Sequence, residues 1–115
     1  MSRPAVRSVV IALSLALISA FGLAQKVTTK TLQGKVLGSG GTQLSGAIVY
    51  LQDNKTNSIR SFISTDDGSY RFGQLSPDTD YQVWARYKNE KSETKPISSY
   101  DSRKQVTIDL HFKTK

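Results

Sequence analysis

Apolar side chains recur at every second position over two stretches of the chain, residues 81–87 and 104–113. Successive side chains of a β-strand point to opposite faces, so this period predicts strands that bury one face and expose the other. After residue 24, no window of the sequence carries an apolar repeat of helical spacing. The alternation therefore favours an all-β fold. The alternating apolar residues are Tyr81, Val83, Ala85, Tyr87, Val106, Ile108, Leu110 and Phe112.

A turn-rich stretch, residues 65–81, separates these strands from the earlier part of the chain. Its Asp67-Gly68 pair predicts a tight hairpin turn, because glycine adopts positive φ values without steric cost. Tyr70 and Phe72 follow at alternate positions, so we expect both on the buried face of a short strand. The stretch is predicted to set the register of the fold.

A second turn and several shorter segments complete the expected strands. Ser76-Pro77-Asp78 predicts a turn because proline fixes φ where the chain bends, and the longest strand then begins near Tyr81. Short strands with turn signals about every 8–12 residues predict an antiparallel, Greek-key-like β-sandwich of about seven strands. The remaining strand candidates are residues 31–37, 46–53, 59–64 and 93–97, the last ending at a proline-blunted edge.

The alternation also predicts which side chains form the core. Burying each large apolar side chain stabilises the fold by about 1.5–3 kcal/mol before conformational entropy is counted. The chain contains no cysteine, so no disulfide adds to this core. The predicted core residues are Leu32, Val36, Ala47, Val49, Leu51, Tyr70, Phe72, Leu75, Tyr81, Val83, Ala85, Val106, Ile108, Leu110 and Phe112.

The first residues have the composition of a secretory signal peptide. Arg3 and Arg7 precede an apolar run, and a small residue at Ala24 precedes Gln25. We therefore predict a signal-peptide helix that is cleaved between Ala24 and Gln25, and a secreted or periplasmic protein. An uncleaved helix that tethers the domain to the membrane is the alternative.

These boundaries predict a signal peptide over residues 1–24, a linker over 25–30 and a sandwich domain over 31–113. Removing Arg3 and Arg7 from the 16 basic residues leaves 14 against 9 acidic ones, a net charge of about +5. The basic residues are scattered and form no run. For an exported domain this pattern predicts a solvated surface, and we expect no nucleic-acid partner.

Four short motifs follow one another along the chain: Leu32-x-Gly34-x-Val36, Leu44-Ser45-Gly46-Ala47-x-Val49-x-Leu51, residues 65–77 and Tyr81-x-Val83. Together they resemble the carboxypeptidase regulatory-like domain, a small transthyretin-like or prealbumin-like β-sandwich. The resemblance covers nearly all of the chain after the predicted signal peptide, and its specificity lies in the order and spacing of short motifs. It implies a non-catalytic, exported module of bacterial envelope proteins, without a cofactor, although a fold alone does not fix a function.

Side chains that could carry chemistry are few. The single histidine, His111, lies on the polar face of the last strand, so a carboxypeptidase-type zinc site with two histidines cannot be built. Asp53, Asp66 and Asp67 are attributed to turns, because the spacing of a calcium-binding loop is absent. We expect no catalytic, metal or cofactor site and a non-enzymatic domain.

Pilin-type modules of related shape cross-link a first-strand lysine to a last-strand asparagine or aspartate with the help of a buried glutamate. Lys35 and Asp109 stand on the corresponding strands of this chain. Alternation puts both on the polar face, however, and the position expected for the glutamate is nearer Ala85. Without that acid to shuttle protons, we expect no isopeptide bond.

One group of side chains remains on the face opposite the core. Trp84 and Arg86 alternate with the core residues of their strand, and Tyr50 and Ile48 do so in another. If the two strands are neighbours, these residues form an amphipathic platform suited to a protein partner or to sugar rings. We expect an interaction or accessory domain with an unknown envelope partner, and a carbohydrate-binding module that uses Trp84 and Tyr50 is the alternative.

Overall fold

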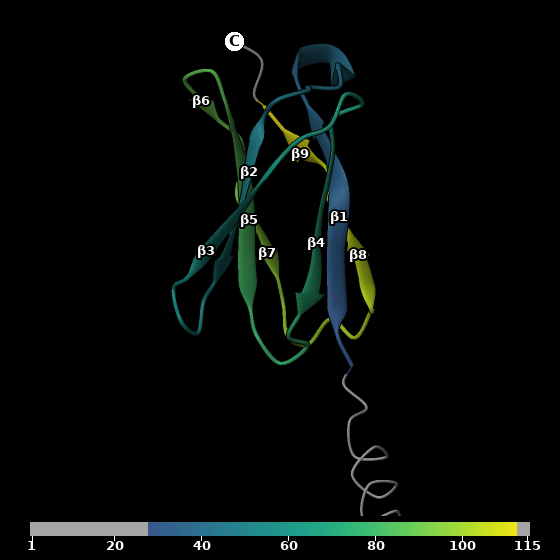
Figure 1. Cartoon of the computed structure of the whole chain (residues 1–115), viewed down its shortest axis with the longest axis vertical. Helices are drawn as coiled ribbons and strands as arrows, with labels where there is room; N and C mark the ends of the chain where they lie inside the picture. The colour runs from purple at the N-terminus through teal and green to yellow at the C-terminus, as the bar shows by residue number, and fades with distance from the viewer. Residues whose placement is uncertain (1–27, 113–115) are drawn as a thin grey trace, which may run out of the picture.

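The computed structural model describes residues 28–112, which form two packed β-sheets joined by short connections (Figure 1). The predicted all-β sandwich is confirmed. The first sheet has the order β4 (Ser69–Leu75), β1 (Lys30–Leu37), β8 (Gln105–Thr107), and β9 (Leu110–His111) also pairs with β1. The second has the order β3 (Ile59–Ile63), β2 (Ile48–Asp53), β5 (Tyr81–Tyr87), β6 (Glu90–Lys91), and β7 (Lys95–Ile97) also pairs with β5.

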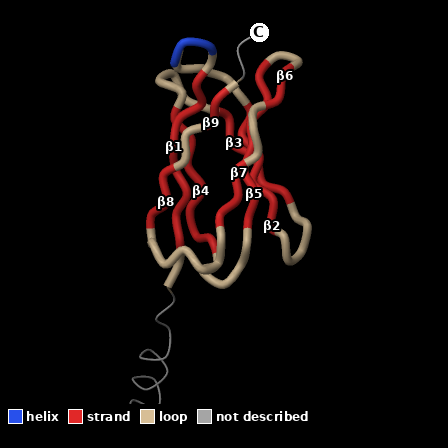
Figure 2. The backbone as a smooth tube through the Cα atoms, turned by 180° about the vertical axis from the view of Figure 1, so that it is seen from behind, coloured by secondary structure: helices blue, strands red, loops and turns tan. Residues whose placement is uncertain are grey.

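The two layers are separate in Figure 2, with β1, β4 and β8 in one and β2, β5 and β6 in the other. A short 3-10 turn, η1 (Ser39–Gly41), follows β1. The predicted signal-peptide helix and its cleavage site at Ala24 and Gln25 lie outside the described residues.

The last predicted strand, residues 104–113, is divided into β8 and β9. Both segments run parallel to β1, so the sandwich is antiparallel everywhere except along this edge. The long connection after β7 lets the chain cross to the other sheet and enter it in the direction of β1. Alternation of apolar residues does not show whether a strand pairs in parallel or antiparallel direction, because the period of two is the same in both.

The division of the last strand has a local cause at Gly34. A Cβ atom on this residue would lie 1.8 Å from the carbonyl oxygen of Ile108, so only glycine lets the chain bulge here. The Tyr70 hydroxyl donates a hydrogen bond of 2.6 Å to the same oxygen. The Lys35 amide donates to Asp109 Oδ1 at 3.0 Å, which replaces a ladder bond lost at the bulge.

The core is the predicted one with two corrections. Ile108 is only partly buried, because the bulge turns it away from the regular alternation. Ile97 is buried instead, since it pairs with Tyr81 on the inner face of β7, a strand too short to show a period. The buried hydrophobic residues are Leu32, Val36, Ala47, Val49, Leu51, Tyr70, Phe72, Leu75, Tyr81, Val83, Ala85, Ile97, Val106, Leu110 and Phe112.

Both predicted turns are present. Gly68 has φ +80°, and its amide donates to the Thr65 carbonyl at 2.9 Å, which closes a tight turn. The strands on either side, β3 and β4, pair in different sheets, so this turn connects the two sheets and is not the predicted hairpin. The second turn contains Pro77 and is tied to the core by Tyr81, whose hydroxyl accepts a hydrogen bond of 2.9 Å from the Ser76 amide.

Candidate functional site

The outer face of the second sheet carries the predicted platform residues. Tyr50 and Trp84 are directly opposite each other on β2 and β5, and Ile48 is opposite Arg86. The two aromatic rings are stacked, with centroids 5.7 Å apart and planes inclined by 22°. The strands are therefore neighbours, as the platform prediction required, and both rings are half-buried on the face away from the core.

The indole of Trp84 has a neighbouring side chain from the strand on each side of β5. Tyr50 comes from β2 on one side of β5, and Lys91 comes from β6 on the other. The Lys91 ammonium lies 5.4 Å from the centre of the Trp84 ring, within cation–π range. A flat ligand could stack on Trp84 only if Lys91 moved.

Two cations stand side by side at one end of this face. Arg86 and Lys91 are cross-strand partners, and both are exposed. Like charges in this position repel each other. No ion pair within residues 28–112 involves either of them. The outward strand positions of this sheet hold no acidic residue, which makes the face suited to an anionic or apolar contact.

Apolar residues extend the platform toward β3. Ile48 is opposite Ile63, and Ile59 is opposite Gln52, so all three isoleucines are on the outer face. Ile59 and Ile63 expose 55% and 66% of their surfaces. Because these isoleucines are outside the core, burial in it does not explain why apolar residues occupy these positions. Sequence alternation could have placed Ile59 and Ile63, but the segment 59–64 shows a mixed pattern.

A concave surface lies over the first sheet, a groove of about 490 Å³ lined by Lys35, Arg71, Thr107 and Asp109 among others. Asp109 there accepts the Lys35 amide, and no ion pair joins the Lys35 ammonium to this carboxylate. Burial raises the pKa of the Tyr70 hydroxyl at the groove floor, and the nearby Asp109 charge adds to the shift. Of the polar groups in the groove, the Asp109 carboxylate and the Tyr70 hydroxyl form hydrogen bonds at the bulge.

The Asp66-Asp67 pair is a turn element, as predicted. Asp67 Oδ1 accepts hydrogen bonds from the Thr65 hydroxyl at 2.6 Å and the Ser69 amide at 3.2 Å. The hydrogen bond from Thr65, followed by those from Ser69, lowers the pKa of Asp67 to about 2. At the other end of the sandwich, Asp53 accepts the amides of Lys55 and Thr56 in the same way.

The single histidine is on the surface, with its Nδ1 atom 3.5 Å from Glu93 Oε1 and just over half of its side chain exposed. Nowhere in the described part of the chain do three His, Asp or Glu side chains gather closely enough to hold a metal ion. Residues 28–112 also include no helix long and apolar enough to cross a membrane.

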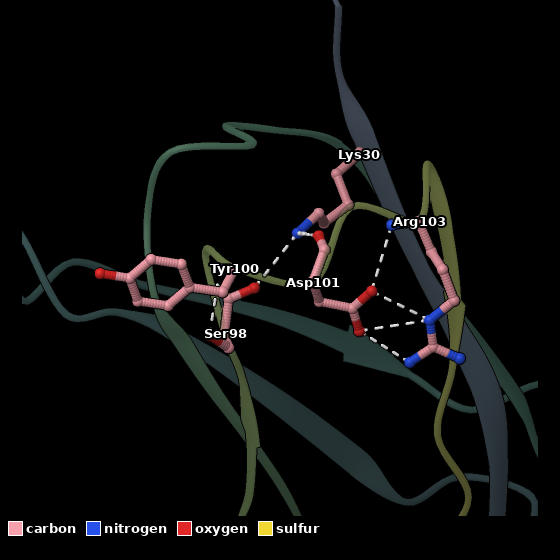
Figure 3. Close-up of polar contacts among 5 residues, drawn as sticks. All are labelled: Lys30, Ser98, Tyr100, Asp101 and Arg103. Atoms are coloured by element: carbon pink, nitrogen blue, oxygen red, sulfur yellow. Dashed lines mark hydrogen bonds and ion pairs between the residues drawn. The ribbon is translucent and has the colours of Figure 1, made fainter.

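A polar cluster beside the start of β1 was not foreseen from the sequence (Figure 3). Lys30 is only 2% exposed, and its ammonium donates to the carbonyls of Asp101 at 2.6 Å and Ser98 at 3.3 Å. Arg103 holds the Asp101 carboxylate through Nε and Nη2, and this pairing lowers the pKa of Asp101 to about 2. Tyr100 projects away from the cluster and is 95% exposed.

This cluster positions the loop between β7 and β8. Asp80 Oδ1 accepts the Ser99 amide at 2.6 Å, and that hydrogen bond lowers the pKa of Asp80. Lys30 is the first residue of β1 and is separated by even spacing from the buried Leu32 and Val36. Extending the alternation of this strand back by two residues is the signal that could have suggested an inward-facing lysine.

Comparison with known proteins agrees with this architecture. Residues 31–113, more than half of the chain, match the family model of the carboxypeptidase regulatory-like domain. None of the curated proteins matches the sequence.

Solved structures of similar fold include the major pilin subunit BcpA of Bacillus cereus, with a TM-score of 0.57, 16% identity and coverage of 74% of this chain and 30% of that one. The pilus 2b backbone protein of group B streptococcus gives 0.54 and 16%, with coverage of 77% and 43%. Catechol 1,2-dioxygenase from Acinetobacter sp. ADP1 gives 0.54 and 13%, with coverage of 76% and 54%. This chain thus spans about a third to a half of their lengths, and identities this low establish the fold alone.

Proposed function

Because the chain belongs to the carboxypeptidase regulatory-like domain family, we propose that it is an exported, non-catalytic β-sandwich module that acts in protein interaction or as an accessory domain of the bacterial envelope. The composition of residues 1–24 supports export. The non-catalytic role is supported by the aspartates described above, which accept hydrogen bonds in turns, at the bulge and in the loop between β7 and β8.

The observation that carries the proposal is the outer face of the second sheet. A domain that stood alone would gain nothing from three exposed isoleucines beside a stacked Tyr50–Trp84 pair. Contiguous exposed apolar surface with aromatic residues at its centre is typical of interaction sites. We assign the contact with the envelope partner to this face.

Export is tested by sequencing the N-terminus of the protein recovered from the periplasm or medium. Gln25 as the first residue supports the proposal, and Met1 on a membrane-bound protein supports the tethered alternative. A hydrolytic activity that is lost in His111→Ala would contradict the non-catalytic role.

The contact face is tested by co-sedimentation of the purified protein with envelope fragments of the source bacterium. We expect the Ile48→Ser/Trp84→Ala double variant to lose most of its binding, because it removes the aliphatic and aromatic centre of the face. Arg71→Ala, on the outer face of the first sheet, is the matched control and should bind like the wild type. Equal binding by all three proteins would show that another surface makes the contact.

A second candidate function is the binding of an acidic polysaccharide. The Tyr50–Trp84 pair beside the cations Arg86 and Lys91 favours it, since rings contact sugar faces and the cations would pair with carboxylates. Protease treatment of the envelope fragments separates the two candidates. Binding that survives protease, fails with neutral polysaccharides and is lost in Trp84→Ala with its circular dichroism unchanged would favour the polysaccharide.

A further inference from the structure

β3 is an edge strand with a complete free side. It pairs with β2 alone, and it forms the outer edge of its sheet in Figure 1. On either side of β3, the Asp53 amide donates to the Ser58 carbonyl at 2.9 Å, and the Ser64 amide donates to the Ala47 carbonyl at 2.8 Å. Because antiparallel pairs alternate between bonded and non-bonded, the amides and carbonyls of Ile59, Ser61 and Ile63 point away from β2. Within residues 28–112, no turn or side-chain hydrogen bond satisfies them.

The edge strand of the first sheet, β4, is irregular, whereas β3 is regular along its whole length. β4 ends with Gly73 and with Gln74 at φ +57°, and its register against β1 shifts near Lys30. On the far side of the second sheet, β7 is short and contains Pro96. Proteins usually protect edge strands by such breaks, by proline or by charge. β3 has no break and no proline, and its outer-face residues Ile59, Ser61 and Ile63 are uncharged. Its one charged residue, Arg60, is on the inner face, where its guanidinium donates to the Gly73 carbonyl of the same chain.

From this edge we infer that β3 is the pairing site for a second copy of this chain, which adds its own β3 in antiparallel direction about a two-fold axis at Ser61. In this register, Ile59 faces Ile63 of the second copy, and their exposed side chains cover each other on the outer face. In this register each of Ile59, Ser61 and Ile63 is opposite one of the same three residues in the second copy. The free amides and carbonyls of the two strands therefore form hydrogen bonds with each other.

The inner face and the flanking turns agree with this register. Arg60, whose guanidinium lies 5.6 Å from the centre of the Phe72 ring of its own chain, is opposite the uncharged Phe62 of the second copy in this register. A shift of two residues in one direction would instead place Arg60 against Arg60, which like-charge repulsion disfavours. Antiparallel pairing also brings the turn before β3, which holds Lys55, toward the turn after it, which holds Asp66. The edge is thus complementary to itself in hydrophobicity and in charge.

Such pairing would continue the second sheet from one copy into the next. The two Tyr50–Trp84 faces would then form one surface on the same side of the joined sheet. This inference concerns β3 and does not depend on what binds to that face.

The test uses the absence of native cysteine in the chain. Across a bonded antiparallel pair the Cα atoms of opposite residues are about 5.5 Å apart, within the range of a disulfide. We expect Ser61→Cys, produced from the full chain, to form a covalent dimer in air. Ser102→Cys, an exposed serine in the loop before β8, is the matched control and should remain several-fold less cross-linked.

Light scattering after size exclusion provides the measurement on the unmodified protein. We expect the wild type to show twice the monomer mass at high concentration and Ser61→Pro to show the monomer mass. Proline removes only an amide that faces outward, so this variant should keep the circular dichroism of the wild type. Ser61→Thr, which keeps the amide, should remain dimeric.

Two results would overturn the inference. One is a monomeric wild type whose Ser61→Cys variant cross-links no faster than Ser102→Cys. The other is a wild-type dimer that persists in a folded Ser61→Pro variant, because the contact would then lie on another surface.

Discussion

Gly34 shows how one residue determines the course of a strand. Its missing side chain leaves room for the Ile108 carbonyl, which then accepts the Tyr70 hydroxyl inside the sheet. The motif Leu32-x-Gly34-x-Val36 could be recognised in the sequence, but its physical reason could not. The reason lies in a residue more than seventy positions away, and no local pattern reports such a distant approach.

We expect Gly34→Ala to destabilise the protein by about 1–3 kcal/mol or more, because the new Cβ atom would force the Ile108 bulge away from β1. Urea unfolding at neutral pH gives the change in free energy of unfolding. Gly73→Ala is the control, since a Cβ atom there meets no atom within 4 Å. Equal losses of stability in the two variants would mean that the close approach at Gly34 does not matter.

Asp67 gives the turn between β3 and β4 a pH dependence. Its pKa is about 2 in the folded protein, below the ordinary 3.8, because the Thr65 hydroxyl and then Ser69 bond the carboxylate. A lowered pKa contributes stability that is present above pH 4 and is lost as the pH falls toward 2. We therefore expect wild type to be more stable than Asp67→Asn at pH 7, with a difference that shrinks between pH 4 and pH 2.

Thermal unfolding across this pH range measures that difference. Asp66→Asn serves as the control, because no hydrogen bond from residues 28–112 reaches the Asp66 carboxylate. A stability difference for Asp67→Asn that is constant from pH 7 to pH 2 would contradict the role of its charge in the turn.

At the scale of elements, alternation predicted the strands whose inner and outer faces differ along their whole length. β2 and β5 are such strands, and the platform of Tyr50 and Trp84 followed from them. The prediction failed where an element is too short to show a period, as for Ile97 in β7, and where a bulge interrupts the period, as at Ile108. The pairing partners and the direction of the last strand depend on contacts between residues far apart in sequence, so alternation could not predict them.

The loop between β7 and β8 depends on a lysine from another element. The Lys30 ammonium is the donor that satisfies the Ser98 and Asp101 carbonyls (Figure 3). We expect Lys30→Met, which keeps the apolar stem, to lower the free energy of unfolding by about 1–3 kcal/mol, because both carbonyls lose this donor. Urea unfolding provides the measurement.

Lys104→Met is the matched control for this variant, since the Lys104 side chain is exposed and forms no hydrogen bond with the rest of the described chain. It should unfold like the wild type. A Lys30→Met protein as stable as Lys104→Met would show that the loop is held by Asp80 and Arg103 without the lysine.

At the scale of the whole molecule, one core holds the two sheets together, and the chain has no cysteine that could form a disulfide between them. Leu32 and Val36 of the first sheet belong to the same buried cluster as Val49 and Val83 of the second. Each sheet has only one apolar face in this cluster, so neither sheet can keep that face dry alone. A small domain of this kind is expected to unfold in a single cooperative step.

Trp84, the only tryptophan, makes this expectation measurable. Its fluorescence reports on the second sheet, whereas far-ultraviolet circular dichroism reports on both. We expect the two signals to give the same urea midpoint, and variants of the first sheet such as Gly34→Ala to shift both midpoints together. If the fluorescence of Trp84 stayed native while Gly34→Ala lowered the midpoint seen by circular dichroism, the second sheet would be stable on its own, and the shared core would not be what stabilises this fold.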